Sequence, residues 1–399
     1  MSQKNALITI LLFYFIGASI TGMFGIEANS LAHSYYQAAL FVLLFGSVLY
    51  TSIKNNTKIN FVNVRPLLVY ITLLIAAALP AAHRVLVYGG SLAEIAQMAI
   101  PPILASTLLI GFSSLRLDKQ DIHKIMKVIV VFLAFGSLYS FAVDYEAILS
   151  ISSISNSYQV DIKGFYFNRN VFGFMMASGV CLAVYLWTTS RKKLYLLLSF
   201  VMCVSMLTSL SRGSILFLVV CLSIFLTKRF GRKVFVPFLI LLSTVPFVFS
   251  QPFVVENVLR QDNGDTGRSE LREYGLKHFL EHNVFTGSGQ QAITSIESRL
   301  EHNSYHNLYI ESLATQGILG LAAVVISIVY ALSFIRSTLK YESTLGVFLM
   351  SYLIAYVVYI YFEALPLFYA TPSSIVATYM LILIPIFLHN SFKQDRLTA

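Results

Sequence analysis

Two arginines in one polar segment have the residue type and spacing of an anion-binding site. Arg268 and Arg272 stand four apart in "TGRSELREYGLKHFLEHNVFTGSG", so they share one face if the segment is helical. Guanidinium groups bind phosphate oxygens bidentately and stay charged at any relevant pH. Glu270 and Glu273 offer the alternative of ordinary surface ion pairs, which contribute little to stability. The segment is therefore either a phosphate-binding face or a solvated helix.

A third arginine occupies an unusual position. Arg212, in "SLSRGS", separates two apolar runs that have almost no loop between them, so it lies at or just below a membrane surface. An arginine at the centre of a span costs roughly 3 kcal/mol on insertion scales. Arg212 is either a substrate contact or an interfacial residue whose side chain extends to the lipid headgroups.

Histidines with helical spacing follow in the same half of the chain. His278 and His282 are four apart, as are His302 and His306 in "HNSYHNLYIESLATQGILG". Zinc needs three or four ligands, and no cysteine or HExxH pattern accompanies these pairs, so we expect no metal site. His306 precedes an apolar run and is the candidate general base, with a purely structural hydrogen bond as the alternative.

The elements that must position these residues are transmembrane helices. Hydrophobic residues make up 57% of the 399 positions and charged residues 12%, against about 25% charged in a soluble domain. Apolar runs of roughly 17–25 residues can each cross a hydrocarbon core about 30 Å thick, and only as helices. We expect an all-α polytopic membrane protein with one transmembrane domain over residues 1–399 and about twelve helices. The expected spans are 6–23, 36–53, 66–82, 96–113, 124–143, 171–189, 193–209, 213–228, 234–250, 317–335, 344–362 and 367–388.

The distribution of charge predicts the orientation. Lysines and arginines gather in the short loops on one side, which places both termini in the cytoplasm. The net charge of +9 is then an orientation signal, and no nucleic-acid partner is expected. Two segments, 144–170 and 251–316, face the other side.

The longer outer segment, 251–316, is expected to carry part of the active site, because long ordered loops are usually functional. It contains a predicted amphipathic helix over 268–282, and Gly287 and Gly289 in "TGSGQQ" predict a turn. The apolar side of that helix is expected to consist of Leu271, Tyr274, Leu276, Phe279 and Leu280.

Three motifs in order resemble the O-antigen ligase and polymerase superfamily of bacterial membrane enzymes. They are "SLSRGS" between two helices, "TGRSELREYGLKHFLEHNVFTGSG" in the outer loop, and "SYHNLYIESLATQGILGLA" leading into the next helix. The resemblance covers roughly residues 165–330. The chain departs from the pattern at Tyr274 or Gly275, where the family usually has an aromatic residue, and at Asn283 or Val284, where it often has proline.

The resemblance implies a GT-C-like architecture and an inverting, metal-independent glycosyltransferase without a cofactor. Its donor would be a glycan on undecaprenyl diphosphate, and it would act in the bacterial cytoplasmic (inner) membrane with the active site facing the periplasm. On this resemblance Arg212 and Arg268 bind the diphosphate, Arg272 is a third contact, and His306 takes a proton from the acceptor hydroxyl. Asn307 and Glu311 would be supporting residues.

The acceptor separates two versions of this activity. A polymerase transfers to another lipid-linked repeat unit and an O-antigen ligase to the lipid A core. "KGFYFNRNVFGFMMASGV" looks more like the polymerases and puts Arg169 on the acceptor side, unless that residue is an interfacial anchor. Membrane lipids and a chain-length regulator are further expected partners.

A polysaccharide transporter or flippase is the competing class. Such proteins place ionisable residues near mid-membrane and show related halves, whereas the polar residues here gather in one outer loop.

Overall fold

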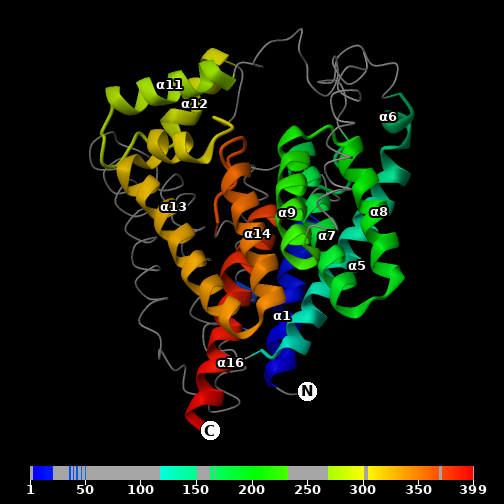
Figure 1. Ribbon diagram of the computed structural model, residues 1–399. Helices are drawn as coiled ribbons and strands as arrows, with labels where there is room; N and C mark the ends of the chain where they lie inside the picture. Colours follow the sequence, from blue (N-terminus) through cyan, green and yellow to red (C-terminus); the bar gives the residue numbers. More distant parts are fainter. Residues whose placement is uncertain are drawn as a thin grey trace.

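The computed structural model describes residues 3–20, 117–150, 162–166, 168–231, 268–300, 304–367 and 371–398, with the single residues 36, 39, 42, 43, 46 and 50. Every regular element in this part of the chain is a helix (Figure 1). Five helical segments are long and apolar enough to cross a membrane: α5 (Lys119–Val143), α7 (Arg169–Ser190), α9 (Arg212–Phe230), α13 (Leu308–Tyr341) and Pro372–His389. The last comprises α15 (Pro372–Thr378), a π-helical turn (Tyr379–Leu383) and the start of α16 (Ile384–Thr398).

Three shorter apolar helices accompany these spans: α1 (Gln3–Ser19), α8 (Lys193–Thr208) and α14 (Ser343–Tyr359). The prediction of a polytopic all-α membrane protein is thus confirmed. Eight of the expected spans coincide with described helices. The other four, at 36–53, 66–82, 96–113 and 234–250, lie wholly or mostly outside the described residues, so the count of twelve stays a prediction.

The buried helix α7 is central to the packing, because it contacts α5, α8 and α9. Gly173 allows the close approach to α9, since a Cβ there would lie 2.7–2.8 Å from three serine side chains. Aromatic and hydroxyl side chains join α7 to α14: Tyr185 stacks on Phe348 with ring centroids 4.7 Å apart, and the hydroxyls of Ser178 and Tyr352 lie 2.8 Å apart. These contacts set the position of the end of α14, where the candidate site lies.

Two polar helices, α11 (Arg268–Glu281) and α12 (Gln290–Leu300), lie at the end of the bundle opposite the chain termini. α1 begins and α16 ends at one end of the molecule, whereas α11 and α12 lie at the other (Figure 1). The arrangement agrees with termini on one side of the membrane, and their cytoplasmic location stays a prediction.

The helix predicted over 268–282 forms, but only part of its expected apolar side is buried. Leu271 is fully buried, whereas Leu276 and Leu280 are 43% and 71% exposed. The buried face of α11 runs through Leu271, Gly275 and His278. These three positions are spaced to lie on one side of a helix.

The turn after α11 packs into a break in α13. Gly317 has φ 65° and ψ −158°, which interrupts the helix and frees backbone groups that would otherwise pair within it. The turn supplies their partners through four backbone hydrogen bonds: Ser288 N to Ala314 O (3.1 Å), Gly289 N to Thr315 O (2.8 Å), Ile318 N to Val284 O (2.9 Å) and Leu319 N to Phe285 O (3.3 Å). Gly287 and Gly289 have φ values of 64° and 61°, so the predicted turn is confirmed.

Candidate active site

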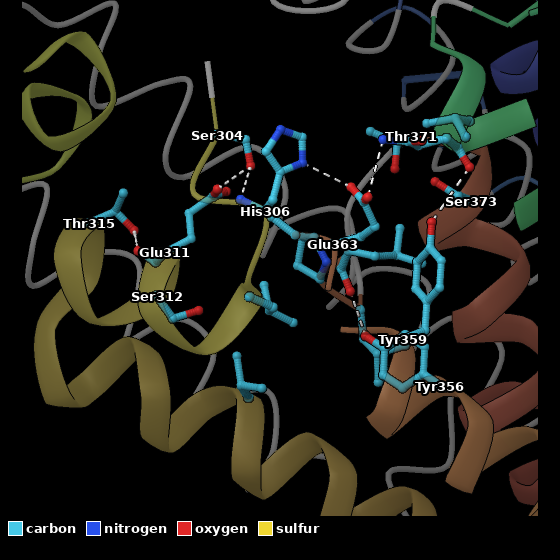
Figure 2. Close-up of a pocket in the computed structure, with 18 of the residues that line it drawn as sticks. Ser304, His306, Glu311, Ser312, Thr315, Tyr356, Tyr359, Glu363, Thr371 and Ser373 are labelled. Carbon is cyan, nitrogen blue, oxygen red and sulfur yellow. Dashed lines mark hydrogen bonds and ion pairs between the residues drawn. The ribbon is translucent and has the colours of Figure 1, made fainter. Parts of the chain in front are cut away.

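A carboxylate just after α14 joins three segments that are far apart in the sequence. Glu363 Oε1 accepts hydrogen bonds from Arg268 Nη2 at 2.8 Å and from Asn170 Nδ2 at 3.2 Å. Its Oε2 lies 3.1 Å from His306 Nδ1. Figure 2 shows the His306 ring and the Glu363 carboxylate meeting beside the cavity. Two of the predicted site residues therefore share one buried acid.

The electrostatics keep this acid ionised. Burial of Glu363, the largest influence, raises its pKa. The hydrogen bond and charge of His306 and the charge of Arg268 act in the opposite direction and together outweigh burial, so the pKa of Glu363 lies below its ordinary value. When the His306 ring is neutral, an ionised Glu363 accepts from its Nδ1–H, which leaves Nε2 as the ring nitrogen that can accept a proton.

His306 is held in an unusual backbone conformation. Its φ of 48° lies in the left-handed region, which costs a non-glycine residue about 1–2 kcal/mol. The surrounding hydrogen bonds maintain it: its N–H donates to Ser304 Oγ at 3.1 Å, and Ser304 Oγ donates to Glu311 Oε2 at 2.7 Å. Glu311 Oε2 also accepts from Tyr305 N at 3.2 Å. Glu311, predicted as a supporting residue, thus folds the loop that presents the histidine.

Asn307 connects the same loop to the end of α14. Its side-chain oxygen caps α13 by accepting from Ile310 N at 3.1 Å, and its Nδ2 donates to Tyr361 O at 3.0 Å. Beside it, Leu308 N donates to Ile360 O at 2.9 Å. These bonds fix His306 relative to Glu363.

The two arginines of α11 face the same segment. Arg268 Nη1 donates to Phe362 O at 3.1 Å, and the guanidinium of Arg272 lies 4.6 Å from the ring centroid of Tyr361. The shared face expected from their spacing is therefore observed. Among the ion pairs of the described residues, Arg268 meets Glu363 and not its neighbours Glu270 and Glu273.

The third arginine begins the helix that borders the site. Arg212 is the first residue of α9, and the next residue, Gly213, packs against the acid. A Cβ on Gly213 would lie 3.2 Å from the Tyr359 ring and 3.5 Å from Glu363 Cγ. The positive end of the α9 dipole is thus beside the carboxylate and adds to the local positive potential.

A cavity of about 560 Å³ lies beside this network. Its polar part is lined by Lys163, Asn168, Asn170, Ser304, His306, Glu311 and Glu363. Its less polar part follows α13 from Gly320 to Ile328, roughly 12 Å of helix, and faces Leu365–Leu367. The predicted arginines are not among the lining residues, which include neither Arg169, whose two neighbours line the cavity, nor Arg212, Arg268 and Arg272. The cavity suits a ligand with a polar head and an apolar tail.

The sequence analysis missed the acid at the centre of this site. Glu363 was not singled out, and neither was the role of Asn170 as its amide donor. A signal was present, because Glu363 directly follows a long apolar run, and ionisable residues at such positions are functional by default.

The histidine pair at the end of α11, His278 within the helix and His282 just after it, makes structural contacts in the described part of the chain. His278 Nε2 lies 2.7 Å from Ser288 Oγ, His282 Nδ1 lies 2.8 Å from His278 O, and the two rings stack 4.0 Å apart. No three His, Cys, Asp or Glu side chains gather to hold a metal among the described residues. His302 of the second pair lies outside them.

Replacing Gly275 by alanine is expected to lower the rate of glycan transfer markedly, with only a small decrease in the thermal midpoint. A Cβ there would lie 2.4 Å from Ile310 Cγ2 and 2.8 Å from the Tyr305 ring, so α11 would shift away from the loop that carries His306. Transfer rate and thermal midpoint should be compared with those of Lys277→Ala, an exposed position on the same helix. A Gly275→Ala protein with unchanged activity would contradict this coupling.

The segment that carries most of the predicted site residues is similar to a known protein family. A family model described as O-Antigen ligase matches residues 197–325, which extend from within α8 to within α13. The match includes Arg212, Arg268, Arg272 and His306. It confirms the resemblance drawn from the motifs. No curated protein matches the chain.

Proposed function

We propose that this chain, a member of the O-antigen ligase/polymerase superfamily on the strength of residues 197–325, polymerises oligosaccharide repeat units linked to undecaprenyl diphosphate. It would be an inverting, metal-independent glycosyltransferase of the bacterial inner membrane, with its site on the periplasmic side. The observation that carries the proposal is the His306–Glu363–Arg268 network beside a cavity with a polar and an apolar part.

The donor would bind through its diphosphate. Arg268 and Arg212 supply fixed positive charge near Glu363, and Arg272 a third contact. Charge developing on the leaving diphosphate is stabilised by such preorganised cations, so no metal ion is needed for this step. The apolar part of the cavity along α13 accommodates the first units of the lipid chain.

His306 would act as the general base. Glu363 holds its Nδ1–H, and Nε2 accepts the proton of an acceptor hydroxyl. The acceptor oxygen then bonds to the anomeric carbon from the face opposite the diphosphate. The bond from that carbon to the diphosphate oxygen breaks, its electron pair leaves with undecaprenyl diphosphate, and the configuration inverts.

The acceptor is the point on which two versions of the proposal differ. Asn168 and Asn170 line the cavity with amide groups suited to sugar hydroxyls, and they belong to the segment that resembles the polymerases. A ligase would use the same donor and base but transfer to the lipid A core. If the protein is a polymerase, Arg169 would contact the acceptor and a chain-length regulator would be a further partner.

The test uses purified protein in detergent, an undecaprenyl diphosphate-linked repeat unit from the host, and EDTA. We expect a product ladder on a gel from the unaltered chain and none from His306→Ala or Arg212→Ala. Transfer that requires added lipid A core would favour the ligase. Failure with both acceptors, or full activity of His306→Ala, would overturn the mechanism, and glycan flipping that survives the substitution would favour a transporter.

A further inference from the structure

Three large apolar side chains are exposed on the polar helix α11 and the turn that follows it. Leu276, Leu280 and Phe285 are 43%, 71% and 67% exposed. Leu276 and Leu280 are one helical turn apart and so lie on the same side of α11. Exposed apolar side chains of this size on one side of a helix are typical of an interaction site.

The packing of α11 fixes which side it exposes. Leu271, Gly275 and His278 are buried, and Gly275 is so close to Ile310 and Tyr305 that no side chain would fit between them. Because these contacts prevent the helix from rolling, the two leucines stay on the outside.

The turn that carries Phe285 adjoins an exposed apolar side of α13. Ile318 N donates to Val284 O, and Leu319 N donates to Phe285 O. The turn that carries Phe285 therefore lies against the part of α13 that begins just after the break at Gly317. From that point, α13 exposes Ile318, Val325, Ile326 and Val329, which are 45%, 45%, 37% and 58% exposed. An apolar helix of a polytopic membrane protein exposes such residues to the acyl chains.

We propose that Leu276, Leu280 and Phe285 insert into the bilayer interface, so that α11 is an interfacial helix partly embedded in the leaflet on its side of the membrane. Four charged residues of α11, Glu270, Glu273, Lys277 and Glu281, are exposed as well, and they would lie in the water and headgroup region around the inserted leucines. This inference depends on the membrane class of the protein and not on its proposed reaction.

The insertion would set the depth of the anion-binding face. Arg268 and Arg272 belong to the same helix as the two leucines and point to the segment that ends in Glu363. With one side of α11 at the interface, their guanidinium groups lie near the level of lipid phosphates. That is the level at which the diphosphate of a membrane-bound lipid is found.

The chain has a single tryptophan, Trp187, which permits a direct test. Leu280→Trp and Phe285→Trp are each made in a Trp187→Phe background and placed in phosphatidylcholine vesicles brominated near the headgroup end of the acyl chains. We expect strong quenching and a blue-shifted emission from both. Glu270→Trp, on another side of the same helix, is the matched control and should show little quenching.

Equal and weak quenching of all three variants would overturn the proposal. Weak quenching combined with protection from iodide would mean that a second copy or another protein covers the surface. If Trp187→Phe fails to fold, spin-labelled Leu280→Cys gives the depth from its relative accessibility to oxygen and to a nickel chelate. High oxygen accessibility is expected, and high nickel accessibility would again exclude insertion.

Discussion

Replacing Glu363 by glutamine is expected to slow glycan transfer by about 10²- to 10⁴-fold, the contribution typical of general acid–base catalysis. The amide keeps the size of the side chain but loses the charge that orients His306 through Nδ1. An amide NH₂ turned toward Nδ1 would also stabilise the tautomer whose Nε2 carries a proton and cannot act as a base. Single-turnover transfer with saturating lipid-linked donor measures this step.

Two comparisons separate catalysis from folding. Glu342→Gln removes another acid that is paired with a cation, Lys119 at 2.8 Å, and should leave transfer unchanged. The double variant His306→Ala with Glu363→Gln should be no slower than His306→Ala alone, because residues that act as a unit are not additive. A double variant that loses the product of the two single effects would show that Glu363 acts independently of the histidine.

Replacing Gly317 by alanine is expected to destabilise the protein by at least about 3 kcal/mol. Its φ and ψ values, 65° and −158°, belong to a region used almost only by glycine, which costs other residues about 1–3 kcal/mol. A Cβ would also lie 2.5 Å from the carbonyl carbon and oxygen of Phe285, and these backbone atoms cannot move aside without breaking the hydrogen bonds of the turn.

Gly231 provides a matched control for the backbone contribution. Its φ of 65° and ψ of −152° are nearly the same, but a Cβ there would meet none of the described residues within 4 Å. Gly231→Ala should therefore show only the conformational cost, and the difference between the two variants measures the contact with the turn. Thermal unfolding in detergent gives both values. Equal shifts would mean that the turn adapts to the extra methyl group.

Eight of the twelve predicted spans coincide with described helices, because the bilayer demands long apolar runs whatever the tertiary packing. The sequence also predicts the shared face of Arg268 and Arg272, since helical spacing is a local property. The role of Glu363 was not predicted, because its partners His306 and Arg268 are 57 and 95 residues away in the sequence and only the packed structure brings them together.

The buried face of α11 does not follow from its apolar residues alone, for a related reason. Leu271, Leu276 and Leu280 belong to the expected apolar side, but of these three only Leu271 is buried. The closest contact of the helix is made at Gly275, where the absence of a side chain matters more than any apolar one. A pattern based on hydrophobic periodicity does not detect close packing through glycine.

The break in α13 has a consequence for how the chain is made. The turn at 283–289 precedes α13 in the sequence, so it is synthesised before the residues around Gly317 to which it is hydrogen-bonded. Backbone groups left unpaired next to lipid are costly, and here their partners already exist when the broken helix is made. Biogenesis therefore depends on the order of the two segments. In a rearranged chain that placed the turn after α13, this helix would form without its break at Gly317. His306 would then no longer be held beside Glu363.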